Sequence, residues 1–121
     1  MAQQSKQTYD YICFSDLAYE SVFTDAIEIE HKIKRRLKYY NLARYDQERV
    51  DAIRKLKNDL QEEISLHSKS KYYNKSRCDY ADLADFNLAK MKADLLKRYP
   101  KITDLDMTQI LNFAVYLYYL R

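Results

Sequence analysis

The sequence contains no glycine, and this absence excludes several kinds of site. A phosphate-binding P-loop, a dinucleotide-binding fingerprint and a nucleophile elbow each need backbone without a Cβ atom at fixed places. The tight turns that join the strands of hairpin folds also favour glycine, because they need positive φ angles. The chain has only one proline. We therefore expect an all-α fold whose helices are separated by polar or prolyl breaks.

Cysteine and histidine are also scarce, with only Cys13, Cys78, His31 and His67 in the chain. No Cys-x-x-Cys or His-x-x-x-His spacing occurs, so the sequence predicts no metal site and no cofactor. Residues 1–7 are polar and lack the apolar core of a secretion signal, from which we expect reduced thiols and a cytoplasmic protein. No pattern of catalytic residues is present, so we expect a binding protein and not an enzyme.

Long apolar runs are missing as well. The longest, residues 113–120, is too short to span a bilayer, so no membrane partner is expected. Hydrophobic residues make up 47% of the 121 residues and charged residues 32%, a composition typical of a folded domain. The length predicts one compact domain overall. The net charge of +3 is too small to identify a nucleic-acid-binding protein by itself.

The first half of the chain predicts a short arm followed by an antiparallel helical hairpin. Residues 1–15 form the arm, in which the aromatic run 8–14 is the most strand-like stretch. Apolar residues at helical spacing predict one helix over residues 16–40 and another over 47–67, with a turn at 41–46 unless the helix continues unbroken. The apolar spacing near 3.5 in the second helix allows it to pack along the first.

Two clusters of basic residues are candidates for nucleic-acid binding. The first, at the end of the helix 16–40, comprises Arg35, Arg36 and Lys38. The second lies in residues 68–78, a predicted basic linker between the hairpin and the C-terminal helices. It comprises Lys69, Lys71, Lys75 and Arg77, interleaved with Tyr72 and Tyr73. Such residues can neutralise phosphates and stack on unpaired bases. A solvated helix face and a plain exposed loop are the alternative interpretations.

Residues 79–121 predict a pair of helices joined at Pro100, which brings the expected total to about four helices. Proline ends the first helix because it lacks a backbone N–H group and restricts the preceding residue. The second begins at Asp104 or Asp106, either of which can cap it, and is apolar nearly all round. Such a helix must be buried nearly all round, which predicts a homo-oligomer, most simply a dimer, unless the helix is the centre of a monomeric bundle. The expected interface residues are Ile110, Leu111, Phe113, Ala114, Leu117 and Tyr118.

This helical pair resembles the ribbon-helix-helix DNA-binding proteins. Residues 108–115, Thr-Gln-Ile-Leu-Asn-Phe-Ala-Val, resemble the second helix of that family, and residues 95–100, Leu-Leu-Lys-Arg-Tyr-Pro, resemble the end of its first helix. The similarity lies within residues 88–121, about a quarter of the chain. It implies a small homodimeric protein that binds double-stranded DNA, with a role in repression or partition, in which the helical pair forms the dimer core.

A second hypothesis belongs to a different class of function. The chain has 13 tyrosines, many of which we expect at the boundary between core and water or in an interface. Asp79 and Asp82 lie where the ribbon-helix-helix family has its base-reading strand, and their charges would repel phosphates. These features favour a helical protein–protein interaction module, such as an adaptor, an assembly factor or an inhibitor, without nucleic-acid binding.

Overall fold

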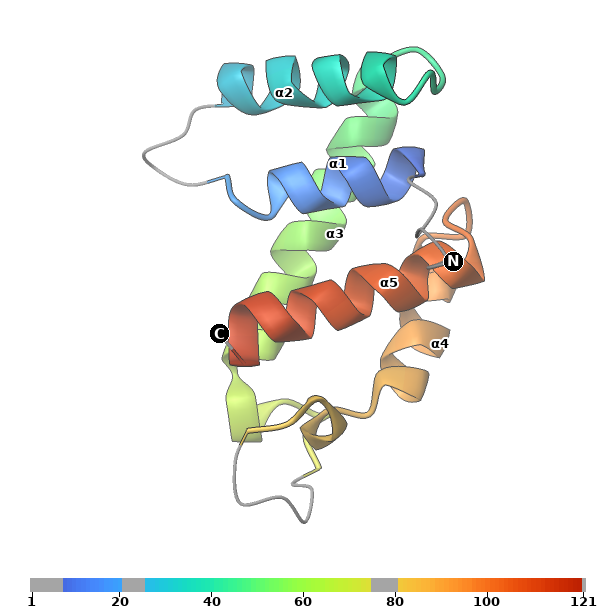
Figure 1. Ribbon diagram of the computed structural model, residues 1–121. Helices are drawn as coiled ribbons and strands as arrows, with labels where there is room; N and C mark the ends of the chain where they lie inside the picture. The colour runs from blue at the N-terminus through green and yellow to red at the C-terminus, as the bar shows by residue number, and fades with distance from the viewer. Residues whose placement is uncertain (1–7, 21–25, 75–80, 121) are drawn as a thin grey trace, which may run out of the picture. The chain divides into compact units, whose positions relative to one another are not determined.

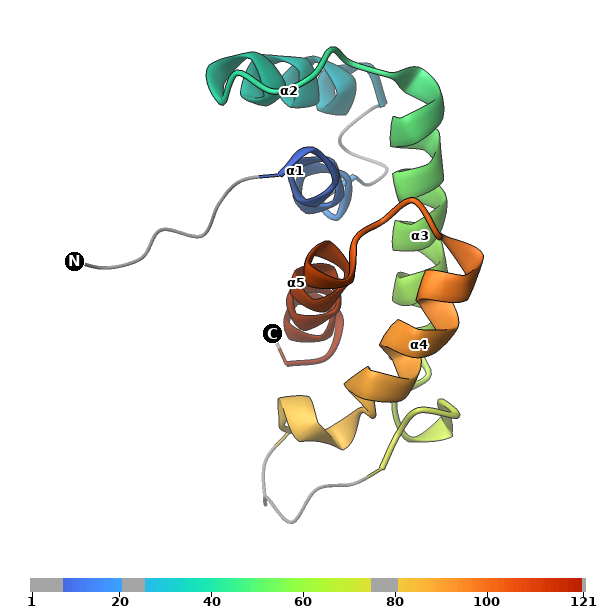
Figure 2. The same cartoon turned by 90° about the vertical axis from the view of Figure 1, so that its right-hand side faces the viewer.

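The computed structural model describes residues 8–20, 26–74 and 81–120, and every regular element in these ranges is helical (Figures 1 and 2). The all-α prediction is therefore confirmed at this level, with five α-helices in the described ranges where about four were expected. They are α1 (Tyr9–Leu17), α2 (Ala26–Tyr39), α3 (Gln47–Ser65), α4 (Leu88–Arg98) and α5 (Asp104–Val115). Three short helical segments accompany them: η1 (His67–Lys69), η2 (Leu83–Asp85) and η3 (Tyr116–Leu120). Within the same ranges, no helix has the length and apolarity needed to cross a membrane.

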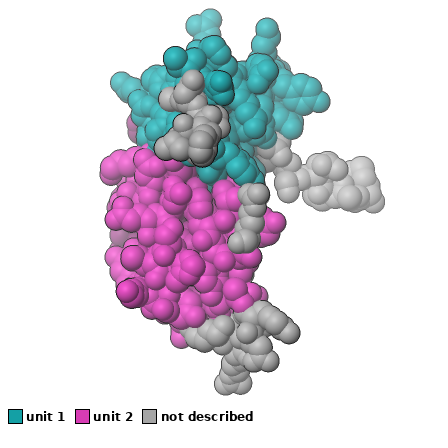
Figure 3. Space-filling view, turned by 90° about the vertical axis from the view of Figure 1, so that its left-hand side faces the viewer, with its two compact units in different colours: residues 1–54 teal, residues 55–121 magenta. Residues whose placement is uncertain are grey.

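The chain divides into two compact units, residues 1–54 and 55–121, shown in two colours in Figure 3. The division falls inside α3, so Gln47 to Arg54 belong to the first unit and the rest of this helix to the second. Each unit is described by itself below. The boundaries expected from the sequence, after residues 15, 67 and 78, remain predictions.

Residues 9–14 are helical and Thr8 is the cap before them, so the strand-like or extended arm expected there is wrong. The Thr8 side chain caps α1 by accepting a hydrogen bond of 3.3 Å from the backbone N–H of Tyr11. Apolar side chains on several sides of the helix are then buried, among them Ile12, Cys13 and Phe14. The strand preference of aromatic residues is weak compared with the stabilisation that this burial provides.

The single helix expected over residues 16–40 is also wrong, because α1 ends at Leu17 and α2 begins at Ala26. The apolar stripe of α2 follows the prediction, since Ile29, Ile33 and Leu37 are buried. This helix packs against α1. The antiparallel pairing with the next helix is not confirmed, because Figures 1 and 2 show α2 running across the start of α3 and not alongside it.

The turn expected at residues 41–46 is confirmed, and Asn41 makes it possible without glycine. Asn41 has a φ angle of 56°, the left-handed conformation that follows many helices and that asparagine tolerates better than most residues. The N–H of Leu42 then donates to the carbonyl of Leu37 over 2.9 Å. Asp46 ends the turn by accepting hydrogen bonds from the N–H groups of Glu48 and Arg49 in the first turn of α3.

The second unit contains a short antiparallel pairing between residues 72–74 and 85–87. The N–H of Asn74 donates to the carbonyl of Asp85, and the N–H of Asn87 donates to the carbonyl of Tyr72. Asn87 also caps α4, which ends at Arg98 before Pro100, as the sequence predicts. Thr103 caps α5, which packs against α4.

The apolar α5 is largely buried in the single chain. Ile110, Leu111 and Ala114, three of the expected oligomer-interface residues, are fully or almost fully buried. The other three, Phe113, Leu117 and Tyr118, are partly exposed. Of the six expected residues, a second copy of the chain could therefore contact only these three without rearrangement of the helix. The homodimer itself stays a prediction.

Candidate nucleic-acid interface

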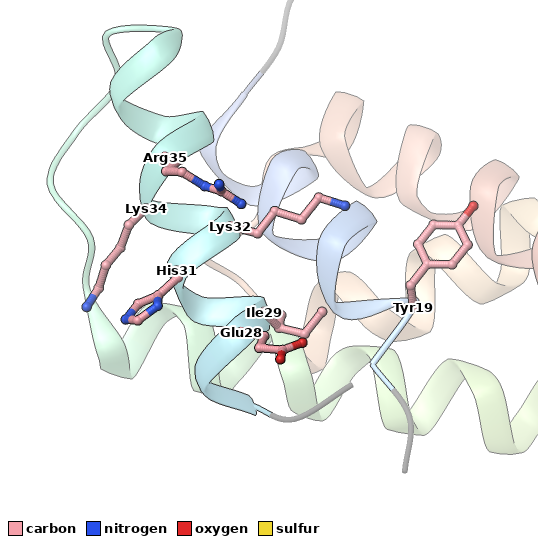
Figure 4. Close-up of a pocket in the computed structure, with 7 residues that line it drawn as sticks. All are labelled: Tyr19, Glu28, Ile29, His31, Lys32, Lys34 and Arg35. Carbon is pink, nitrogen blue, oxygen red and sulfur yellow. The ribbon is translucent and has the colours of Figure 1, made fainter. Parts of the chain in front are cut away.

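The basic cluster at the end of α2 presents three cations to solvent. Lys34, Arg35 and Lys38 are exposed, and Lys38 lies within about one turn of both other residues, although Lys34 and Arg35 point to different sides of α2 (Figure 4). We call these three residues the α2 basic face. Within the described ranges, Arg35 and Lys38 take part in no ion pair, and the Nζ atom of Lys34 lies 4.8 Å from the centre of the Tyr45 ring.

Arg36, which was grouped with these cations in the sequence-based prediction, has a different role. Its Nη1 atom lies 2.6 Å from Oδ1 of Asp16 and 3.2 Å from the hydroxyl of Ser15. Asp16 is buried, and its Oδ2 atom has no hydrogen-bond partner, so loss of the Arg36 guanidinium would leave a buried carboxylate poorly compensated. We therefore assign Arg36 to the packing of α2 on α1 and not to a ligand.

The second predicted cluster is only partly described, because Lys75 and Arg77 lie outside the described residues. Lys69 and Lys71 are exposed. Tyr72 is only 7% exposed, and its hydroxyl donates a hydrogen bond of 2.7 Å to Asp94. Its ring is therefore part of the core of the second unit and is not available to stack on a base. The two basic clusters belong to different units of the chain.

The start of α5 is a poor site for an anion. In the ribbon-helix-helix family the backbone N–H groups at this point bind a DNA phosphate, as helix N-termini can. Here Asp104 and Asp106 lie in the first turn, and the N–H of Asp106 donates to the hydroxyl oxygen of Thr103. The Nζ atom of Lys92 lies 3.1 Å from Asp104 and offsets only part of this negative charge.

A hollow of about 740 Å³ adjoins the α2 basic face (Figure 4). Residues of α2 line it, including Lys32, Arg35 and Glu28, together with Tyr19 from the turn after α1. The sequence-based prediction did not include Tyr19 or Lys32, because it treated residues 16–40 as one continuous helix. No glycine or proline marks the break after α1, so no local signal was available to find this arrangement.

Cys13 is the buried free thiol of the first unit. Burial, followed by the nearby Asp10 carboxylate, raises the pKa of the Cys13 thiol to about 12. A thiol with this pKa stays protonated and is a poor nucleophile near neutral pH. Across the described part of the chain, no group of three or more His, Cys, Asp or Glu residues is placed to hold a metal ion.

The arrangement on α2 is a set of exposed cations, Lys34, Arg35 and Lys38, beside a hollow that Lys32 also lines. Comparison with known proteins assigns the chain to no family. No protein-family model matches the chain, and no curated protein or solved structure shows significant similarity to it.

Proposed function

We propose that the protein binds DNA through the α2 basic face. The observation that carries this proposal is that Arg35 and Lys38 are exposed on one side of the helix without an ion-pair partner among the described residues. Lys34 and Lys38 are four residues apart, a spacing at which like charges destabilise a helix. A bound polyanion would convert this repulsion into attraction.

The position of these cations near the end of α2 reduces the destabilisation that their mutual repulsion causes. Lys38 lies in the last turn of α2, where the helix dipole favours positive charge. The helix therefore tolerates a dense set of cations at this end in the absence of a ligand. The resemblance of residues 95–100 and 108–115 to ribbon-helix-helix proteins supports DNA as the polyanion, with repression or partition as the role.

The homodimer belongs to this proposal, and it would use the surface side of α5. Leu105 and Tyr116 are 65% and 53% exposed and lie three helical turns apart on one side of the chain segment that begins with α5. Asn112 lies between them and is also exposed. The same surface favours the second candidate function, a protein–protein interaction module, in which another protein covers Leu105 and Tyr116.

A binding measurement across a salt series tests the DNA proposal. Fluorescence polarisation of a labelled random-sequence oligonucleotide should show binding at low salt that weakens steeply as salt rises, because phosphate contacts release counterions. Arg35→Ala/Lys38→Ala should weaken binding to all sequences. The control Lys97→Ala/Lys101→Ala removes the same charge from exposed positions in the second unit and should bind nearly as the parent does. Absence of binding at low salt would overturn the proposal in favour of the protein-interaction module.

A further inference from the structure

Two tyrosines next to the α2 basic face present their rings to solvent. Tyr39, the last residue of α2, is 80% exposed, and Tyr40 is 41% exposed. Their ring centroids lie 4.9 Å apart and their planes meet at 89°, an edge-to-face contact that favours one arrangement of the two side chains. Such a contact covers only part of each ring, so aromatic surface of Tyr39 remains accessible to a ligand.

Two cations of the α2 basic face are the neighbours of Tyr39 on the helix surface. Arg35 lies four residues before Tyr39 and three residues before Lys38, and side chains at these spacings are adjacent on a helix. This surface lies opposite the buried stripe of Ile33 and Leu37. An anion bound at Arg35 and Lys38 would therefore lie beside the Tyr39 ring.

The segment that carries the two tyrosines has no acidic residue. Residues 31–45 contain six lysines and arginines and no aspartate or glutamate. Arg44, in the turn after α2, is another exposed cation of this segment. Asp16 reaches the segment from α1, but it is buried and its Oδ1 atom lies 2.6 Å from Arg36. The charge around the tyrosines therefore favours an anionic ligand.

The aromatic rings distinguish between the classes of anion. The face of an aromatic ring carries partial negative charge, so it disfavours the carboxylates of an acidic peptide but stacks on a flat nucleobase. Helices that bind anionic membranes insert Trp, Phe or Leu side chains, whereas the strongly exposed large hydrophobic residues of the segment 31–45 are Tyr39 and Tyr40. A DNA strand supplies a base and a phosphate in every nucleotide and fits both features of this surface.

We infer that Tyr39 stacks on an unpaired base of a DNA strand whose phosphates lie at Arg35 and Lys38. The inference rests on the proposed function and specifies the form of DNA. In a duplex the neighbouring base pairs cover both faces of each base, so a ring on the protein surface gains a stacking partner only at an unpaired or terminal base. Loss of the Tyr39 ring should therefore weaken binding to a single strand and leave binding to continuous duplex unchanged.

Fluorescence polarisation with labelled oligonucleotides of one length tests this inference. The probes are a single-stranded oligo(dT), the same strand with abasic sites, and the strand paired with oligo(dA). Tyr39→Ala should weaken binding of oligo(dT) about tenfold, with an unchanged salt slope, because it removes stacking and not charge. Tyr39→Phe should bind as the parent does, since it keeps the ring. The abasic strand and the duplex should bind the parent and Tyr39→Ala alike.

The chain has no tryptophan, which allows a direct observation of the stacked base. Tyr39→Trp introduces a single indole, whose fluorescence is quenched when a base stacks on it. Saturating oligo(dT) should quench this fluorescence, whereas the abasic strand and the duplex should not. Tyr116→Trp is the matched control, because Tyr116 is a 53% exposed tyrosine of the other unit, and its replacement should give fluorescence that oligo(dT) leaves unchanged.

Circular dichroism of each variant confirms that it is folded. If Tyr39→Ala binds oligo(dT) as tightly as the parent, or if bound oligo(dT) leaves Tyr39→Trp unquenched, the inference is overturned while DNA binding stands. If polyglutamate of equal charge or phosphatidylserine vesicles displace oligo(dT) as well as unlabelled oligo(dT) does, the surface binds acidic peptides or anionic lipid and the inference is also overturned. If no oligonucleotide binds at low salt, the proposed function itself fails.

Discussion

The hydroxyl of Tyr99 donates a hydrogen bond of 2.7 Å to Oδ2 of Asp59, which lies forty residues earlier in the chain. Asp59 is on α3, and Tyr99 is the residue that follows the last turn of α4. The Nη2 atom of Arg98 lies 2.6 Å from the same carboxylate oxygen. One carboxylate on α3 thus binds both residues at the end of α4, just before the chain turns at Pro100 towards α5.

We expect Tyr99→Phe to lower the free energy of unfolding by about 1 kcal/mol. The substitution removes one hydrogen bond to a charged acceptor and keeps the ring, and partial exposure of both residues reduces the loss. Urea unfolding measured by circular dichroism gives the value. Tyr39→Phe is the control, because Tyr39 is strongly exposed and its hydroxyl makes no described hydrogen bond. Equal stability of the two variants would show that the Asp59 bond contributes nothing.

Stability should fall between about pH 10 and pH 12. Burial, followed by the hydrogen bond to a carboxylate, raises the pKa of Tyr72 and that of Tyr99 to about 12 from the ordinary value of 10.0. The unfolded chain therefore loses these protons at lower pH than the folded chain does. The contribution of each tyrosine is complete below pH 10 and is lost as pH rises through the folded pKa.

Urea midpoints at a series of alkaline pH values check this dependence. The double variant Tyr72→Phe/Tyr99→Phe has no such protons to lose and should show a shallower decline than the parent above pH 10. The pH profile of the Tyr39→Phe control should match that of the parent. A decline as steep in the double variant as in the parent would contradict the assignment to these two hydroxyls.

Ala114→Leu should destabilise the protein by about 1–3 kcal/mol, because Ala114 is fully buried and a larger side chain would overpack its surroundings. Ala93→Leu makes the same change at an exposed position of α4 and should have an effect within about 0.5 kcal/mol. Thermal unfolding of both variants provides the comparison. If Ala114→Leu melts with the parent, then α5 is less tightly packed than the structure indicates.

Sedimentation equilibrium tests the predicted homodimer. We expect the mass of two chains at tens of micromolar and the mass of one chain for Tyr116→Asp, which would place a charge in the proposed interface on the surface side of α5. Since Tyr116 is 53% exposed in the single chain, the substitution should leave the helical circular dichroism signal intact. A parent protein with the mass of one chain at every concentration would rule the dimer out.

Periodicity in the sequence predicted most of the helical core. The stripe of α3, Val50, Ile53, Leu56, Leu60 and Ile64, is buried as expected, and Pro100 marks the end of α4. The first unit was predicted less well. The helix α1 is buried on several sides, so its sequence lacks the one-sided apolar pattern that identifies a helix. Its conformation depends instead on tertiary burial and on the Thr8 cap.

The residues of the candidate site were likewise predicted only in part. Charge density along the sequence was enough to find Arg35 and Lys38, but it could not distinguish them from Arg36, whose partner Asp16 lies on a different helix. Tyr19 could not be assigned to the same hollow as Lys32 and Arg35, because that arrangement depends on the packing of α2 against α1. Sequence patterns report which residues share a helix face, whereas ion pairs between helices and hollows between them depend on the fold.

The salt dependence of binding to double-stranded DNA of random sequence tests the central claim most directly. The logarithm of the association constant should fall linearly with the logarithm of the salt concentration, by about 0.9 for each phosphate contacted. If Arg35 and Lys38 each contact a phosphate, Arg35→Ala/Lys38→Ala should reduce the slope by about 1.8, while Lys97→Ala/Lys101→Ala should leave it unchanged. An equal slope for the parent and Arg35→Ala/Lys38→Ala, or no binding by the parent at low salt, would contradict the assignment of the α2 basic face as the site of DNA binding.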